Sequence, residues 1–362
     1  MTMHGGDVYS AAEALKIPVR NVIDFSASVN PLGPSKKVKA AMRSALKELG
    51  RYPDSQCRRL VKKIARGYGI GEKNIVCGNG SNELIHLAMA VTRPRRVLVT
   101  APAFAEYERA ARLAGAEIVK LPLAESDGFR VSTEAFSEAM RGCDAAFLCN
   151  PGNPAGTLIP RADVLAIADA ANTADCLLII DEAFMDFCRD ESVMRDAAAG
   201  EPDIRPGMIV LRSLTKYHAL AGLRIGFGLF PPEIKAAIDA IKDPWSVNAL
   251  AEVAAATALP DKAFAKETAA WLSAEKKYMG KGLAALGFAI YPSEANFFLV
   301  KHDLAQGLRE HLYRRGILLR DCSNFDGLDG TFLRIAVRSR RENARLLREM
   351  KWWFGRISGE DA

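Results

Sequence analysis

The hydrophobic positions of the chain fall into short apolar runs that alternate with amphipathic segments. Continuous apolar runs of a few residues predict buried strands, and apolar residues spaced by three or four positions predict helices. This alternation is clearest before about residue 246. The expected strands are 74–78, 96–100, 117–121, 145–150, 176–181, 208–213 and 224–230, and the expected helices include 81–92, 104–115, 160–173 and 232–242.

Apolar strands between amphipathic helices predict an α/β fold, in which helices cover both faces of a mostly parallel seven-stranded sheet. Beyond this part the pattern becomes a long helical region with a break at Pro260. Strands follow at 296–301, 317–321 and 331–337, with a helix near 303–315 and a final helix. We expect a large domain over residues 31–245 and a smaller α+β domain formed by residues 1–30 and 246–362.

Composition and charge narrow the class of protein. The chain has 362 residues, of which 49% are hydrophobic and 25% charged, as in globular proteins with a large core. The formal net charge is +6, and the densest basic runs are 93–96 and 338–348. Neither run has the interleaved aromatic residues of a nucleic-acid module. We therefore expect no nucleic-acid partner, and the charge is compatible with a small acidic substrate.

The cysteines and the amino terminus bear on localisation. Seven cysteines occur, an odd number, without a CxxC pair, and several stand inside apolar runs. This usage indicates reduced, mostly buried thiols and a cytoplasmic protein. The amino terminus lacks the apolar region of a signal peptide, and no apolar run approaches the ~20 residues of a membrane span. Five histidines without an HxxxH pair predict no metal site.

The strand expected at 74–78 runs into a Gly-Asn-Gly segment at 78–80, and a helix is expected to start at Ser81. Glycines let the backbone approach a ligand closely, and the free N–H groups at a helix start bind anions such as phosphate. The segment differs from a dinucleotide fingerprint because Glu83 stands where the third glycine would be. A phosphate site and an ordinary glycine turn are equally compatible with this segment alone.

The segment CNPGNPAG at 149–156 begins at the end of the strand expected at 145–150. Two Asn-Pro steps make a rigid, extended turn that displays asparagine side chains. Asn153 could therefore hydrogen-bond a ligand, although a plain polar loop is the simpler interpretation of this segment by itself.

Asp181 follows four apolar residues at the end of the strand expected at 176–181. A carboxylate buried there is costly unless a positive group faces it. A protonated ring nitrogen of a ligand would be such a group. The alternative is that Asp181 caps the turn that follows.

The strand expected at 208–213 delivers Ser213, and Lys216 and Arg224 follow at short spacing. Ser213 and Arg224 suit a phosphate, because arginine offers a forked pair of donors. A desolvated lysine loses its charge readily and can form a Schiff base with an aldehyde. The alternative is that Lys216 only neutralises the phosphate.

Taken together, the four segments specify one ligand. It has a phosphate, a ring nitrogen that needs a carboxylate, a ring oxygen that accepts from asparagine, and an aldehyde for a lysine. Pyridoxal 5′-phosphate carries all four groups. We therefore predict a site for this cofactor beyond the carboxyl ends of the strands, where open α/β sheets bind ligands.

The order GNGS, NPAG, DEAF, SLTK and LRIGF resembles the fold-type I pyridoxal-phosphate enzymes, the aspartate aminotransferase superfamily, over nearly the whole chain. Within it the chain is most similar to the threonine-phosphate decarboxylases of cobalamin biosynthesis, which are related to the histidinol-phosphate aminotransferases. The segments that carry this closer resemblance are HGGD at 4–7, DFSASVNPLGP at 24–34, RYPD at 51–54, DEAFMDF at 181–187, RSLTK at 212–216, DPWSVNALA at 243–251 and the stretch 320–343.

The resemblance implies roles for the cofactor-binding residues. Lys216 would form the Schiff base with the cofactor, Asp181 would pair with the pyridine nitrogen, and Asn153 would bond the ring oxygen. Phe104 would stack on the ring. The residues that would hold the cofactor phosphate are Gly80, Ser81, Asn82, Ser213 and Arg224.

The resemblance also implies substrate and partner contacts. Tyr52 would reach the cofactor phosphate of the other subunit, which implies a homodimer with shared active sites. Arg334 would bind the substrate carboxylate, with Asn30 nearby. The candidates around a substrate phosphate are His4, Gly5, Gly6, Arg320 and Arg338.

The implied reaction is decarboxylation of L-threonine O-3-phosphate to (R)-1-amino-2-propanol O-2-phosphate, the linker precursor of the cobalamin nucleotide loop. Phe184 favours this subgroup, because many aminotransferases have a tyrosine there. Histidinol-phosphate transamination and decarboxylation of L-serine O-phosphate remain alternatives, since the same residues serve each and the bond that breaks depends on its angle to the ring. A pyridoxal-phosphate regulator would need an added DNA-binding domain, for which we expect no room.

Overall fold

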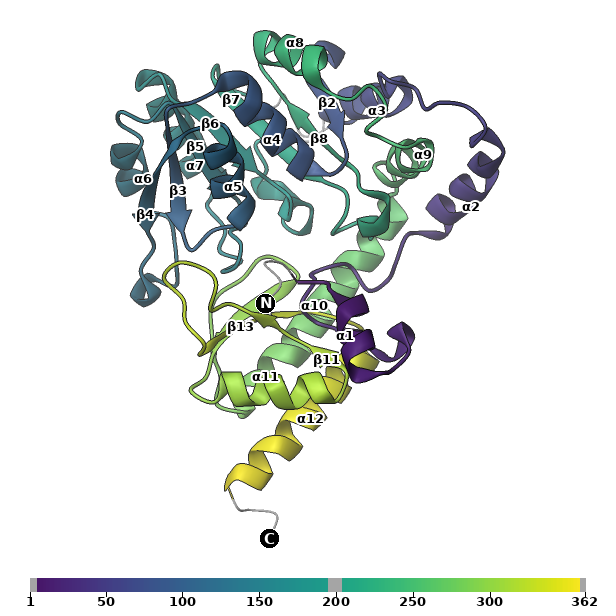
Figure 1. Ribbon diagram of the computed structural model, residues 1–362, viewed down its shortest axis with the longest axis vertical. Helices are drawn as coiled ribbons and strands as arrows, with labels where there is room; N and C mark the ends of the chain where they lie inside the picture. The colour runs from purple at the N-terminus through teal and green to yellow at the C-terminus, as the bar shows by residue number, and fades with distance from the viewer. Residues whose placement is uncertain (1–4, 195–203, 359–362) are drawn as a thin grey trace.

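The computed structural model describes residues 5–194 and 204–358, and its largest element is a seven-stranded sheet (Figure 1). The strand order is β2-β8-β7-β6-β5-β3-β4. The pairs from β7 to β4 are parallel, whereas β8 runs antiparallel to both of its neighbours. The strands are β2 Ile75–Gly78, β3 Arg96–Ala101, β4 Glu117–Pro122, β5 Ala145–Cys149, β6 Leu177–Asp181, β7 Met208–Ser213 and β8 Gly226–Leu229.

Helices cover both faces of this sheet because its central strands are apolar on both sides. In β6, Leu178 and Ile180 join the hydrophobic cluster on one face, and Ile179 joins the cluster on the other. The first face is covered by α2 Lys36–Ala45, α3 Arg58–Tyr68, α6 Thr133–Ala139, α7 Arg161–Thr173 and α9 Ala249–Ala258. The second face is covered by α4 Ser81–Thr92, α5 Ala105–Leu113 and α8 Pro232–Ile241.

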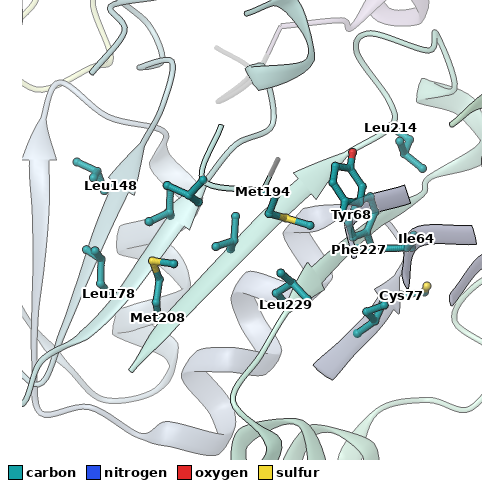
Figure 2. Packing of buried hydrophobic residues seen from close by; sticks show 14 of the residues in the cluster. Ile64, Tyr68, Cys77, Leu148, Leu178, Met194, Met208, Leu214, Phe227 and Leu229 are labelled. Carbon is teal, nitrogen blue, oxygen red and sulfur yellow. The ribbon is translucent and has the colours of Figure 1, made fainter. Parts of the chain in front are cut away.

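The first of these clusters is the largest part of the core. Figure 2 shows Leu148 of β5 and Leu178 of β6 in this cluster, with Tyr68 of α3 next to Phe227 of β8. The ring centroids of Tyr68 and Phe227 are 6.0 Å apart. Complete burial of side chains of this size stabilises the fold by roughly 1.5–3 kcal/mol each. The sheet is therefore a firm platform for the residues at its strand ends.

A second unit is built on a four-stranded antiparallel sheet of order β12-β13-β10-β9, below the large sheet in Figure 1. The amino-terminal segment joins this unit, because β1 Ile23–Asp24 pairs in parallel with β11 Ile317–Leu318. The other elements are β9 Ala289–Ile290, β10 Phe297–Lys301, β12 Arg320–Asp321, β13 Phe332–Ala336, α1 Val8–Leu15, α10 Lys262–Ala285, α11 Ala305–Arg314 and α12 Arg340–Ser358.

In the large unit the observed bounds of the predicted elements differ from the expected ones by at most two residues. The mostly parallel seven-stranded sheet is confirmed. The domain division at residue 245 stays a prediction, and α9, which follows it, packs into the first cluster with the large sheet. Within the described ranges, no helix combines the length and apolar character needed to cross a bilayer.

Candidate active site

A cavity of about 420 Å³ lies at the carboxyl ends of β5, β6 and β7, between the large sheet and the small unit. Because parallel strands end at one edge of a sheet, the polar residues that follow them face a common space. Most of the predicted site residues line this cavity. They are Gly5, Ser81, Asn82, Phe104, Asn153, Asp181, Ser213, Lys216, Arg224, Arg320 and Arg334.

An anion-binding cradle lies at the start of α4. Gly80 has a φ of +78°, and a Cβ on it would lie 2.6 Å from Nη2 of Arg224. A Cβ on Gly226 would lie 2.6 Å from the backbone nitrogen of Ser81. The Arg224 guanidinium therefore lies against the first turn of α4, where N–H groups lack helical partners. Ser213 stands opposite Gly226 in the β7–β8 register, so a hydroxyl completes a donor set suited to phosphate.

Lys216 stands beyond the end of β7, beside this cradle. Its Nζ donates to Oγ1 of Thr215 at 3.2 Å. Burial, followed by the positive charges of Arg224 and Arg334, lowers the pKa of Lys216 to about 8. A larger fraction of the amine is therefore neutral and nucleophilic near neutral pH than for an exposed lysine.

Asp181 ends β6 and is 4% exposed. Its Oδ2 accepts from the hydroxyl of Tyr107 at 2.7 Å, and its Oδ1 accepts from the backbone N–H of Ala183 at 3.0 Å. Burial raises the pKa of Asp181, whereas these hydrogen bonds and the charge of Lys216 oppose the rise. The carboxylate is held in one orientation and would be stabilised further by a cationic ring nitrogen in the cavity.

Asn153 and Arg334 form a pair that joins the two units across the cavity. Nη1 of Arg334 donates to Oδ1 of Asn153 at 2.6 Å, and its Nη2 donates to the carbonyl of Ser26 at 2.9 Å. The bond orients the Asn153 amide so that its Nδ2 can donate to a ligand oxygen. Burial lowers the pKa of Arg334 to about 10, because its charge is desolvated. An anion in the cavity would relieve that cost.

A buried ion network lies behind the site and connects β7 to the segment after β6. Arg212, 2% exposed, donates from Nη1 to Glu182 and from Nη2 to Asp186, each at 2.7 Å. Glu182 also accepts from the hydroxyl of Ser192 at 2.6 Å. Glu182 follows Asp181 directly, and Arg212 precedes Ser213. The network therefore fixes the relative positions of two strand ends that carry site residues.

Several predicted residues contact the site less directly. Gly6 lies beside the cavity, where its N–H donates to Oγ of Ser26 at 2.8 Å. Asn30 is buried and donates from Nδ2 to the carbonyl of Tyr217 at 2.9 Å and to Oγ1 of Thr268 at 3.0 Å, so it supports the chain next to Lys216.

Three predicted residues stand apart from the cavity or outside the described ranges. Arg338 pairs with Glu342 at 2.8 Å and does not line the cavity. Tyr52 is 80% exposed and packs on Trp245, with ring centroids 4.7 Å apart. His4 lies outside the described residues.

Sequence reasoning missed Tyr107, Arg212 and the pair Asn324 and Phe325, although Tyr107, Asn324 and Phe325 line the cavity. Tyr107 stands inside a helix among charged residues, and nothing nearby in the sequence distinguishes it. Arg212 did carry a signal, because a charged residue inside an apolar strand needs a buried partner.

The donor set fits pyridoxal 5′-phosphate. The cradle beside Arg224 suits its phosphate, Asp181 suits its pyridine nitrogen, and Lys216 is partly neutral. Three polar atoms of cavity-lining residues, Oγ of Ser28, Oδ1 of Asn82 and Nε of Arg334, are buried without a hydrogen-bond partner among the described residues. Buried polar atoms are normally satisfied, so a ligand at this place accounts for them.

Comparisons with known proteins agree with this geometry. The family model described as aminotransferase class I and II matches residues 20–350. The threonine-phosphate decarboxylase of Salmonella typhimurium is 38% identical, over 96% of this chain and 95% of that protein. The histidinol-phosphate aminotransferase of Symbiobacterium thermophilum is 35% identical, over 94% of this chain and 92% of that protein.

A solved structure of a related enzyme has the same fold as this chain. The histidinol-phosphate aminotransferase of Clostridium acetobutylicum is 32% identical and superposes with a TM-score of 0.83, over 91% of this chain and 98% of that chain. The resemblance stated from the sequence motifs is confirmed. This chain belongs to the aminotransferase class I and II family.

Proposed function

We propose that this protein decarboxylates L-threonine O-3-phosphate to (R)-1-amino-2-propanol O-2-phosphate and CO2. One observation carries the proposal: two buried guanidinium groups, those of Arg320 and Arg334, line the same cavity as Lys216 and Asp181. Threonine phosphate has two anionic groups, a carboxylate and a phosphate, so one guanidinium group is available for each end of this substrate. The name of the Salmonella relative, threonine-phosphate decarboxylase, supports the same substrate.

The cofactor is pyridoxal 5′-phosphate, which accepts the electron pair left at Cα when the carboxylate departs. Lys216 would hold its aldehyde carbon, Asp181 its pyridine nitrogen and Asn153 its ring oxygen. The residues that would hold its phosphate are Gly80, Ser81, Asn82, Ser213 and Arg224.

The chain contributes orientation and proton transfer. Arg334 would bind the substrate carboxylate and Arg320 its phosphate, so both ends of the substrate are fixed. This sets the angle of the Cα–carboxylate bond, and orientation of that kind can supply several kcal/mol of a reaction barrier. Lys216, with its pKa near 8, can hold a proton on Nζ and deliver it to Cα after CO2 leaves.

We further propose a cytoplasmic homodimer whose product supplies the linker of the cobalamin nucleotide loop. Tyr52, 80% exposed, packs on Trp245, 50% exposed, and the exposed Leu46 and Leu49 precede Tyr52 closely in the chain. Large exposed apolar side chains that gather on a surface favour a protein interface. Tyr52 would contact the cofactor phosphate of the partner subunit there.

A direct assay tests the proposed reaction. The purified protein with pyridoxal 5′-phosphate and L-threonine O-3-phosphate should release CO2 and an amine with the mass of aminopropanol phosphate. Lys216→Ala is the control and should release neither. Absence of CO2 together with glutamate-dependent amino transfer would refute the decarboxylase and assign an aminotransferase.

A further inference from the structure

The loop between β12 and β13, residues 322–331, forms part of the cavity wall. Asn324 and Phe325 of this loop line the cavity next to Arg320, which belongs to β12. The same two loop residues also line an outer cleft beside α5. They therefore lie between the candidate active site and this outer cleft.

Both residues contact Arg320 directly. Nη2 of Arg320 donates to Oδ1 of Asn324 at 2.9 Å, and the guanidinium carbon lies 5.0 Å from the centre of the Phe325 ring. Arg320 is 7% exposed, and burial lowers its pKa because the charged form is desolvated. A guanidinium in this setting gains from an anion and from a fixed orientation toward it.

The large unit anchors the loop. Asp326 forms an ion pair with Lys120 of β4, and Lys120 also pairs with Glu108 of α5 at 3.1 Å. The hydrogen bond that Lys120 donates to Asp326 raises the pKa of Lys120. Gly327 follows with a φ of +82°, and a Cβ on it would lie 3.8 Å from the carbonyl of Ala101. Both units thus determine where Asn324 and Phe325 stand.

We propose that Asn324 and Phe325 are positioning residues, which hold Arg320 for the phosphate end of the substrate and thereby set the requirement for a phosphate. The amide fixes the guanidinium by a hydrogen bond, and the face of the aromatic ring packs against the guanidinium. This inference rests on the proposed function, because it assigns Arg320 to the substrate phosphate.

Binding of two unreactive acids tests the inference. The probes are 3-(phosphonooxy)propanoate and 3-hydroxypropanoate, which lack an amine and differ only in the phosphate. Displacement calorimetry on the cofactor-loaded protein gives the ratio of their affinities. Wild type should prefer the phosphorylated acid, and Asn324→Ala should reduce that preference roughly tenfold while the affinity for the hydroxy acid stays the same.

Further variants separate the contribution of the Asn324 hydrogen bond from that of the Phe325 ring. Asn324→Asp should reduce the preference more than Asn324→Ala, because its carboxylate neutralises Arg320 and repels the phosphate. Phe325→Leu keeps the apolar contact but loses the ring, and should reduce the preference about threefold. Ser323→Ala is the matched control, since Ser323 is exposed in the same loop without lining the cavity, and should keep the wild-type ratio.

The outcomes separate this inference from the proposed function. Asn324 variants that keep the wild-type ratio, or that weaken both acids equally, would overturn the positioning role even if wild type decarboxylates threonine phosphate. A wild-type protein that binds both acids equally would instead refute the phosphorylated substrate, and the inference with it.

Discussion

At the scale of single residues, Asp181 depends on a hydroxyl that the sequence did not reveal. Tyr107 is 1% exposed and donates to Asp181 at 2.7 Å, which opposes the increase in pKa caused by burial. Tyr107→Phe should therefore raise the pKa of Asp181, so that its ionised form is lost at a higher pH. We expect the acid limb of kcat/KM to move to higher pH and its maximum to fall about tenfold.

A pH profile of the variant beside wild type checks this. Tyr9→Phe is the control, because Tyr9 is 74% exposed. An unchanged acid limb in Tyr107→Phe would mean that the hydroxyl does not control the carboxylate.

The lowered pKa of Lys216 predicts how cofactor capture depends on pH. The amine reacts with an aldehyde only when neutral, and its pKa is about 8 instead of the ordinary 10.5. The rate of Schiff-base formation by the cofactor-free protein should therefore rise with pH and level off above about pH 8. Stopped-flow absorbance measures this rate. A midpoint near 10.5 would show that the lysine is not desolvated.

The sequence predicted the cavity-lining residues at or soon after the ends of apolar strands, namely Asp181, Ser213 and Asn153, because a polar residue at the end of a buried strand is unusual. It could not predict Tyr107, which is 74 positions from its partner Asp181 in the chain. It also could not separate Arg320, which lines the cavity, from Arg338, which pairs with Glu342. The direction of a side chain depends on tertiary packing.

At the scale of elements, the Arg212 network should be essential for stability. Arg212→Ala would leave the buried carboxylates of Glu182 and Asp186 without their main cation, and loss of one partner from a buried ion pair costs about 3–5 kcal/mol. Urea unfolding measures the change. Arg205→Ala, which removes a partly exposed pair with Asp169, should cost less than about 1 kcal/mol.

Similar unfolding midpoints for the Arg212 and Arg205 variants would contradict the structural role of the network.

The sequence predicted the bounds of the surrounding strands and helices well, because apolar runs and helical periodicity mark their extent. It did not predict that β8 runs antiparallel, since a strand pattern carries no direction.

At the scale of the whole molecule, a shared active site predicts complementation between subunits. If Tyr52 acts on the cofactor of the partner subunit, a dimer of one Lys216→Ala and one Tyr52→Ala subunit has one intact site and one doubly altered site. Refolding the two variants together at equal amounts should restore about a quarter of wild-type activity, because half the dimers are mixed. Each variant alone is the control, and no recovery would mean that Tyr52 does not act across an interface.

Reaction of L-threonine O-3-phosphate in D2O tests the central claim most directly. If Lys216 protonates Cα after the carboxylate leaves, each CO2 should accompany one amine that carries a single non-exchangeable deuterium at that carbon. Mass spectrometry of the product with simultaneous CO2 measurement gives both quantities. Equal amounts of CO2 and singly deuterated aminopropanol phosphate are predicted. Substrate consumption without CO2, together with an amino form of the cofactor, would contradict a decarboxylase.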